Sequence, residues 1–450
     1  MSVSTGGVKL REPQIEIGEQ FDEIEIHNPI DTHQHWRGAE HATKILPTAK
    51  TADGKLVRNL HNEHRADLMF DTVVPMTGKI YSAAVGMPNL IPEHIDTKEA
   101  LLSYNSRVLA LLEKEQIDNF TPWYKISFTK NLTPKIIEEC YNTWLPVSVK
   151  FYPGGATTNA EWAMTEFDVD AQAGNLEMME KLWIPFSLHS QTSLQHDEDG
   201  NITAWFVDRA EREFVDQVIP KIAEKYPKLK IIIEHISTKE AVEMVKKFPN
   251  VYGGVTPSHM FHTKHDLIGS GQMKPHNFIT PVPNEPEDKK AIRELVLSRH
   301  PRVMFGTDSA PHSEDKKECA VCASGVFSSP IALQKIAEFY YSNADKIERK
   351  PWEEGLSYKQ LVQKAMQEFT SDTAQEVYGP VPESSKKVVK LKRKDMKIPD
   401  RFFIAGDKIG DKDIWVVPME AGSTISWTID SIGGKVVQIT NQWVEFQQAA

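Results

Sequence analysis

Eight short apolar segments, rich in β-branched residues, recur between residues 24 and 310 and alternate with longer segments of helical period. They are residues 24–35, 80–89, 121–128, 147–153, 184–190, 229–237, 251–259 and 302–310. Repeated strand-then-helix units favour a parallel sheet that is covered by helices. Eight such units predict an α/β fold of the (β/α)8 TIM barrel type.

The segments between the expected strands carry apolar residues at helical spacing. Between the fifth and sixth strands such residues recur at every fourth position: Ala210, Phe214, Val218 and Ile222. This spacing predicts an amphipathic helix on the outside of the barrel. After the sixth strand, Ser237 and Glu240 have the spacing of a capping box. Three apolar residues then follow on one helix face: Ala241, Val245 and Phe248.

The barrel units occupy most of the chain, so we expect the barrel to span residues 24–379 after an N-terminal extension of residues 1–23. Within that span, residues 38–66 are expected to form a polar insertion and residues 331–379 further helices. Residues 380–450 contain short strand-like runs. We expect this tail to pack on the outside of the barrel rather than to form a domain of its own.

The composition restricts which partners the protein is expected to bind and in which compartment it is expected to act. A net charge of −11 argues against nucleic acid as a partner, because phosphate binding needs a basic face. The basic stretch from Lys386 to Lys397 favours a solvated strand face, with a localisation or nucleic-acid signal as the alternative. No apolar run approaches the roughly 20 residues that cross a bilayer, and the N-terminus lacks the apolar core of a secretory signal. With only three cysteines, the sequence favours a cytoplasmic protein without a membrane partner.

Potential metal ligands stand near the ends of five of the expected strands. In a TIM barrel the carboxyl ends of the strands meet at one open face, where the active site lies. The residues are His33, His35, Lys150, His189, His235 and Asp308. The HxH pair alone is a weak signal, because two ordinary surface or core histidines explain it better than a metal site does. Its combination with the other strand ends predicts a metal centre.

Lys150 stands inside an apolar strand, where lysine is rarely found. One interpretation is a buried ammonium paired with Asp308. The other is that burial lowers its pKa, so that the neutral amine reacts with carbon dioxide and the resulting carbamate bridges two metals. We favour the second interpretation, because it explains the neighbouring ligands as well.

The ligand set suits two zinc ions bridged by carboxylated Lys150. His33, His35, Lys150 and Asp308 would surround one ion, and Lys150, His189 and His235 the other. A bridging water would ionise near neutral pH, and Asp308 would act as the catalytic proton carrier. The predicted reaction is hydrolysis of an amide-like C–N bond, or its reverse.

Six segments of the sequence resemble the dihydroorotases of the shorter, monofunctional type, which belong to the amidohydrolases. They are DTHQHWR (31–37), VVPMTGKIYSAAVGMPNL (73–90), VKFYPGGATTN (149–159), IIEHISTKEA (232–241), VTPSHM (255–260) and FGTDSAPH (305–312). The resemblance implies interconversion of N-carbamoyl-L-aspartate and L-dihydroorotate in pyrimidine biosynthesis, two zinc ions, a carboxylated lysine and a homodimer. The family's metal ligands fall on the six residues already named.

The resemblance also implies a set of substrate-binding residues: Arg37, Asn89, His312, Thr157 and Thr158. A guanidinium and neutral donors suit the carboxylate of such a substrate. The two threonines match a loop that closes over the substrate, and the glycines before them allow it to move.

The chain departs from the family pattern at Gln191, where an acidic residue is expected two positions after the fifth-strand histidine. In the segment 319–326, the resemblance implies a backbone contact to substrate near Ser324. Cys319 and Cys322 form a CxxC without a second pair, which favours a structural or incidental role over a zinc site.

Three histidines spaced by three, His259, His262 and His265, are expected in a loop after the seventh strand. A structural or exposed role is favoured for them over a second metal site. His276 could line the pocket, and we assign it no role.

Two other functions remain compatible with these patterns. A hydantoinase-like cyclic amidase would share the metal site, although Arg37 and Asn89 favour a substrate that carries a carboxylate. A noncatalytic barrel that serves as a binding scaffold would usually have lost metal ligands, and Lys150 and Asp308 are both present.

Overall fold

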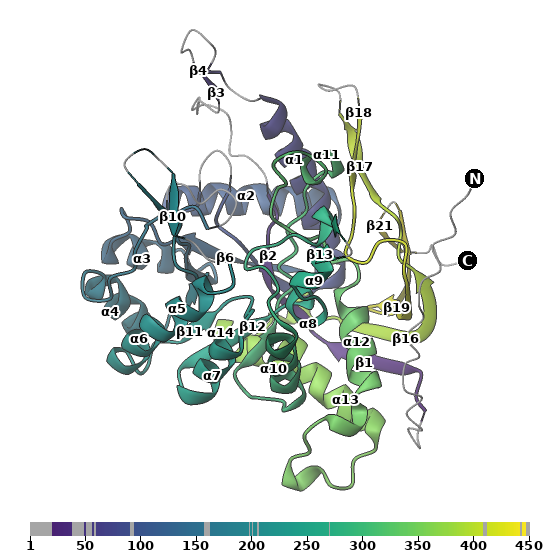
Figure 1. Ribbon diagram of the computed structural model, residues 1–450. Coiled ribbons are helices and arrows are strands. Elements are labelled where there is room, and N and C mark those ends of the chain that lie inside the picture. Colours follow the sequence, from purple (N-terminus) through teal and green to yellow (C-terminus); the bar gives the residue numbers. More distant parts are fainter. Residues whose placement is uncertain are drawn as a thin grey trace.

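Eight parallel strands form the centre of the molecule in the computed structural model (Figure 1). They are β2 (Ile30–Gln34), β5 (Ala83–Gly86), β6 (Thr121–Ser127), β7 (Val147–Phe151), β8 (Phe186–Leu188), β11 (Ile231–Ile233), β12 (Val251–Val255) and β15 (Val303–Phe305). The structure describes residues 20–37, 49–50, 56–57, 60–90, 94–156, 163–197, 199, 201–204, 207–269, 271–407, 412–441 and 443–446. Each of the eight strands lies inside one of the eight segments expected from the sequence.

The sheet closes between its first and last strands. The strands follow one another in chain order from β2 to β15, and a parallel bridge joins Gln34 to Ser309 across the remaining gap. The backbone N–H of His35 donates to the carbonyl oxygen of Ser309 at 3.1 Å. Below this bridge, the Asp31 carboxylate accepts a hydrogen bond from the backbone N–H of Thr307 at 2.8 Å. The predicted (β/α)8 barrel is therefore confirmed.

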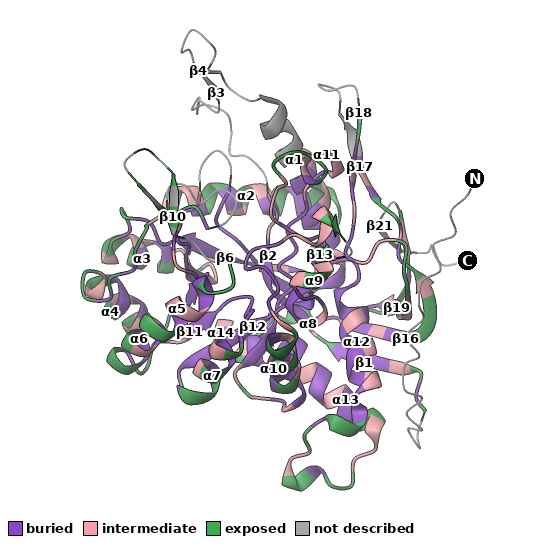
Figure 2. Cartoon of the chain, in the orientation of Figure 1, coloured by how far each residue is buried: buried purple, intermediate pink, exposed green. Residues whose placement is uncertain are grey.

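Helices surround the barrel. Each buries one face against it, so that the exposed residues lie on the outer side of the helix (Figure 2). The longer ones are α1 (Leu60–Ile80), α2 (Lys98–Lys114), α3 (Pro134–Tyr141), α4 (Ala173–Leu182), α5 (Ala210–Gln217), α6 (Ile219–Lys225), α7 (Lys239–Lys247) and α10 (Pro286–Leu297). Three short helices lie above the strand ends: α8 (Pro257–Phe261), α9 (Lys264–Leu267) and α11 (Glu314–Lys317). No helix in the described part of the chain is both long and apolar enough to cross a membrane.

Further helices and small hairpins complete the barrel region. The late helices are α12 (Ala332–Ser342), α13 (Tyr358–Gln367) and α14 (Thr373–Tyr378), with a π-helical turn at Glu368–Asp372 before the last. The hairpins pair β3 (Ala49–Lys50) with β4 (Leu56–Val57), β9 (Gln195–His196) with β10 (Ile202–Ala204), and β13 (Ile268–Gly269) with β14 (Gln272–Met273). Most of the expected insertion at 38–66 lies outside the described residues, and its end belongs to α1.

A second, antiparallel sheet is built from both ends of the chain (Figure 1). Its order is β1-β16-β19-β20-β21, and β17 pairs with β18 beside it. The strands are β1 (Glu23–His27), β16 (Val388–Lys397), β17 (Phe402–Asp407), β18 (Lys412–Val416), β19 (Thr424–Ile432), β20 (Lys435–Thr440) and β21 (Trp443–Phe446). Burial alternates along the first half of β16, and Lys390 forms an ion pair with Glu25 at 3.1 Å. The basic side chains from Lys390 onward therefore form the solvated strand face that the sequence favoured, whereas Lys387 is buried and donates to the carbonyl oxygen of Gly78 at 2.7 Å.

The first expected strand, residues 24–35, is in fact two strands in two different sheets. β1 pairs with β16, and only β2 enters the barrel. Asn28 takes a left-handed conformation, with φ of 53°, and Pro29 follows without a backbone N–H. These two residues end β1 and redirect the chain, so the expectation of one continuous strand was wrong.

Two helix predictions differ from the structure in detail. The side chain that caps α7 belongs to Thr238, whose hydroxyl accepts from the backbone N–H of Ala241, and not to Ser237. The Ser237 hydroxyl instead donates to Glu211 at 2.5 Å. The single helix expected from residue 210 is two helices, α5 and α6, because Pro220 has no N–H to continue the hydrogen-bond ladder of α5.

Gly86, at the end of β5, allows the buried Trp36 to pack against the barrel. A Cβ at this position would lie 2.6 Å from two atoms of the Trp36 indole, and Trp36 is fully buried. We expect Gly86→Ala to lower the free energy of unfolding by about 1–3 kcal/mol, measured by urea denaturation. Gly355→Ala is the matched control, because a Cβ there meets no atom within 4 Å. Equal stability of the two variants would contradict this prediction.

Candidate functional site

The carboxyl ends of the barrel strands bring the expected ligands to one end of the barrel. His33 lies in β2 and Lys150 in β7, whereas His189, His235 and Asp308 come within three residues of the ends of β8, β11 and β15. Because all eight strands are parallel, these ends open on the same face. One cavity is lined there by His33, His35, His189, His235, Asp308, Arg37 and Asn89. The sequence-predicted residues on the described strand ends therefore lie together.

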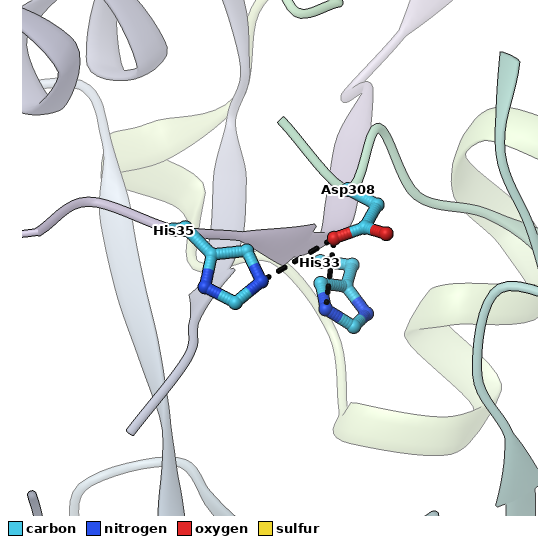
Figure 3. Close-up of side chains that lie close together, drawn as sticks. All are labelled: His33, His35 and Asp308. Atoms are coloured by element: carbon cyan, nitrogen blue, oxygen red, sulfur yellow. Dashed lines mark ion pairs between the residues drawn. The ribbon is translucent and has the colours of Figure 1, made fainter. Parts of the chain in front are cut away.

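His33, His35 and Asp308 form the first compact group (Figure 3). The Oδ1 atom of Asp308 lies 3.3 Å from Nε2 of His33 and 3.3 Å from Nε2 of His35. The donor atoms of all three residues lie within 4.8 Å of one another. Two imidazole nitrogens and a carboxylate oxygen in this arrangement match the ligand types that zinc takes in proteins.

His189 and His235 form a second pair beside the first group. Nδ1 of His189 lies 3.1 Å from Nε2 of His235, so the two ring nitrogens face one another. The ring centroids of His235 and His33 are 5.2 Å apart, which places the pair directly beside the first group. Two nitrogens at this separation are suitably placed to bind one ion between them.

Lys150 lies among these histidines with no hydrogen-bond partner in the described part of the chain. Its side chain is fully buried, its Nζ atom is unpaired, and the ring centroid of Tyr152 is 5.1 Å away. No ion pair to Asp308 was found, so the interpretation of Lys150 as a paired ammonium is not supported. A buried amine without a partner, surrounded by imidazoles, fits a group that could bind a metal.

Burial sets the protonation of these groups. It lowers the pKa of Lys150 to about 7, helped by Lys125 and opposed by the carboxylates of Glu234 and Asp308. Burial also lowers the pKa of His33 to about 4. At neutral pH the imidazole is therefore uncharged and Lys150 is partly a free amine, which are the forms that metal binding and carbon dioxide capture require. The residues present thus fit a metal centre.

The residues expected at the substrate end lie around Arg37. Its Nη2 atom is 2.9 Å from Nε2 of His312, and its Nε–H donates to the carbonyl oxygen of Pro311 at 3.3 Å. Asn89 accepts a hydrogen bond from the Tyr152 hydroxyl at 3.0 Å. Thr157 and Thr158 lie outside the described residues. Arg37 and Asn89 suit a substrate carboxylate, because their guanidinium and amide groups line the same cavity.

Two charged residues behind the metal ligands did not emerge from the sequence. Oε2 of Glu234 lies 2.8 Å from Nδ1 of His33, and Oε1 of Glu234 forms an ion pair with Lys125. Burial would raise the pKa of Glu234, but Lys125 and Lys150 outweigh that effect and hold it well below its usual range. The sequence contained a signal for both residues, because a glutamate and a lysine stand in apolar segments. The same signal singled out Lys150.

Gln191, the departure from the family pattern, contacts a metal ligand. Its Oε1 atom lies 2.7 Å from Nε2 of His189. The other amide atom, Nε2, is buried and has no hydrogen-bond partner among the described residues. The segment after His189 therefore supports the site through a neutral amide.

The other histidines and the CxxC pair lie outside this cluster. His259 is buried in α8 rather than in a loop, and its ring nitrogens lie 2.7 Å from the Thr256 hydroxyl and 2.9 Å from the Pro281 carbonyl oxygen. His276 lies 2.8 Å from a carboxylate oxygen of Glu318. The other two histidines of the series differ in burial: His262 is buried and His265 is exposed. In the CxxC pair, Cys322 is partly buried and Cys319 is exposed.

Comparison with known proteins identifies several relatives. Residues 154–379 match the family model described as amidohydrolase. A dihydroorotase from Escherichia fergusonii is 32% identical over 366 residues, covering 80% of this chain and 92% of that protein. One from Klebsiella pneumoniae is 32% identical over 374 residues, covering 82% and 95%.

Dihydroorotases are also among the solved structures that this chain resembles. The dihydroorotase from Campylobacter jejuni superposes with a TM-score of 0.70 at 30% identity, covering 92% of this chain and 99% of that one. The Saccharomyces cerevisiae dihydroorotase, solved with 5-fluoroorotic acid, has a TM-score of 0.69 at 26% identity, covering 96% and 100%. An L-hydantoinase from Arthrobacter aurescens has a TM-score of 0.60 at 13% identity, covering 92% and 85%, so it shares the fold.

Lys317, in α11, ties together one wall of the cavity. Its ammonium donates to the carbonyl oxygens of Phe278, Ala323 and Gly325 at 2.9, 2.8 and 2.8 Å, and Gly325 lines the cavity. We expect Lys317→Met to lower the free energy of unfolding by about 2 kcal/mol or more, because buried carbonyl groups lose their donor. Urea denaturation of this variant against Lys316→Met, its less buried neighbour, measures the effect. The prediction fails if both variants unfold at the same urea concentration.

Proposed function

This chain belongs to the dihydroorotase family of the amidohydrolases, and we propose that it interconverts N-carbamoyl-L-aspartate and L-dihydroorotate in pyrimidine biosynthesis. The observation that carries the proposal is the unpaired amine of Lys150, buried among histidines at the strand ends. A carboxylated lysine that helps to hold two metals would account for such a group.

Six residues would hold the metals. His33, His35, Lys150 and Asp308 would bind one zinc ion, and Lys150 with His189 and His235 the other. When bound, the zinc pair would lower the pKa of water and polarise the amide carbonyl of the substrate. The neutral state of the buried histidines, with the pKa of His33 lowered by burial to about 4, keeps their nitrogen lone pairs available at physiological pH.

Lys150 would become a ligand by a simple addition. Its neutral amine attacks the carbon of carbon dioxide, a new N–C bond forms, and the nitrogen loses one proton to solvent. The product is a carbamate with two oxygen atoms. The lowered pKa supports this step, because an ordinary lysine is almost entirely protonated at neutral pH and cannot act as a nucleophile.

Asp308 would carry the proton. Burial raises the pKa of its carboxyl group, although the charges of His33 and His259 partly oppose the effect. During hydrolysis it would accept a proton from the attacking water and deliver it to the ring nitrogen as the C–N bond breaks. In the synthetic direction the same carboxyl group would take the proton from that nitrogen.

Arg37, Asn89 and His312 would bind the substrate carboxylate, and Thr157 and Thr158 would belong to a loop that closes over it. The guanidinium of Arg37 supports this role, because it lies at the cavity that also contains the expected metal ligands. We also expect a cytoplasmic homodimer with no nucleic-acid or membrane partner. The proposed arrangement of barrel and tail, residues 24–379 and 380–450, stays a prediction.

Replacing Lys150 tests the metal centre. We expect wild type to contain two zinc ions per chain, and Lys150→Ala to lose metal and to hydrolyse dihydroorotate about 10³-fold more slowly, since a metal contributes several kcal/mol. Metal analysis and a dihydroorotate assay measure both. In wild type stripped of metal, zinc uptake with bicarbonate should rise as the pH passes about 7, where Lys150 loses its proton. Full activity in the variant, or active wild type without metal, would overturn the mechanism.

Replacing Arg37 tests the choice of substrate. We expect wild type to prefer dihydroorotate to hydantoin, and Arg37→Met to lower kcat/KM for dihydroorotate by about 10- to 100-fold through a higher KM, because charged hydrogen bonds are lost. Arg37→Lys retains the positive charge but lacks the paired N–H donors of the guanidinium. It should therefore recover part of the lost kcat/KM. An unchanged KM in Arg37→Met, or preference of wild type for hydantoin, would favour the hydantoinase-like alternative.

A further inference from the structure

His33 in the first group of metal ligands and His189 in the second contact different kinds of acceptor through their remote ring nitrogens. Behind the first group, Nδ1 of His33 faces a carboxylate oxygen of Glu234 at 2.8 Å. Glu234 is itself paired with Lys125, and all three side chains are buried. This arrangement makes His33 a donor at Nδ1 and leaves Nε2 to point at Asp308, 3.3 Å away.

Behind the second group, a neutral amide takes the place of the carboxylate. Nε2 of His189 faces Oε1 of Gln191 at 2.7 Å, which leaves Nδ1 of His189 to face His235. The remote nitrogen of His235, Nδ1, is buried and has no partner in the described part of the chain. Neither histidine of this group therefore contacts a charged acceptor through its remote nitrogen.

The difference affects how strongly each histidine binds a cation. A carboxylate that accepts the remote N–H of an imidazole raises the basicity of the other nitrogen, and such partners change metal affinity by about 10- to 100-fold when they are removed. A neutral amide fixes the orientation and the tautomer of the ring with a weaker polarising effect. His33 should therefore be the stronger ligand, and His189 the weaker one.

Packing alone does not explain Gln191. The side chain is fully buried, yet its amide nitrogen has no hydrogen-bond partner among the described residues, which lowers stability. An apolar residue of similar size would avoid this loss. The contact that Gln191 does make is the one to His189.

We propose that Glu234 and Gln191 are positioning residues that give the two metal positions unequal affinity. The position of His33, His35 and Asp308 is the tight one, and the position of His189 and His235 releases and exchanges its ion more readily. This inference rests on the two-metal centre of the proposed function.

Zinc titration of the full-length protein tests the proposal. Metal-free protein in bicarbonate buffer is titrated with Zn²⁺ against a chromogenic chelator. We expect two binding events in wild type that differ at least tenfold in affinity, and His235→Ala should remove the weaker one. Gln191→Glu places a carboxylate behind His189 and should tighten the weaker event by about 10- to 100-fold, leaving the stronger event unchanged.

Two further variants complete the comparison. Gln191→Met removes the acceptor at similar volume and should weaken the second event about tenfold, so the test stands if Gln191→Glu fails to fold. Gln334→Glu is the matched control, because Gln334 is an equally buried glutamine in α12 that does not line the cavity. It should leave both zinc events unchanged.

The outcomes separate the two proposals. A folded wild type that binds no zinc overturns the proposed metal centre. Two zinc ions bound with equal affinity, or a second event that neither Gln191 variant alters, overturn the unequal positions and leave the metal centre intact. Equal tightening of both events by Gln191→Glu also contradicts the proposal, because that carboxylate would contact only one ligand.

Discussion

A network of buried charges at the centre of the barrel governs the whole site. Lys125 and Lys150 lie with Glu234 inside strands and strand ends that are otherwise apolar, and all three are excluded from solvent. Burying isolated charges is costly, so they must be paired or neutralised. Lys125 and Glu234 neutralise one another. Burial lowers the pKa of both lysines, but Lys150 has no hydrogen-bond partner among the described residues. The reactive amine and the inert ion pair thus follow from the same low-dielectric interior.

Closure of the barrel fixes the ligands relative to one another. Asp31 accepts hydrogen bonds from the backbone N–H of His33 at 3.1 Å and from the Thr307 hydroxyl at 2.6 Å. It therefore joins the strand that carries His33 to the residue before Asp308. Because the first and last strands are far apart in the sequence, this carboxylate couples completion of the fold to assembly of the first ligand group.

Local sequence patterns predicted the strands and helices, but they did not predict contacts between residues far apart in the sequence. The eight strands were found because each is a short apolar run, and their parallel order then brought the strand-end histidines together. The interruption at Asn28 and Pro29 is also local, and the sequence contained its signal. Glu234 and Lys125, by contrast, are 109 residues apart, and no periodicity connects them. The sequence marks Gln191 only as a departure from the family pattern, and its contact with His189 depends on the fold of the loop after β8.

The expected metal ligands and the expected substrate residues come from different parts of the barrel. The expected metal ligands stand in the barrel strands or within three residues of their ends, in a fold that an L-hydantoinase of 13% identity shares. The residues expected at the substrate carboxylate come from the segments that follow the strands, as His312 does after β15. Lys317 holds the neighbouring segment, which contacts His312, through the carbonyl groups of Ala323 and Gly325. Changes in these segments could therefore alter substrate preference without disturbing the buried charges around the expected metal ligands.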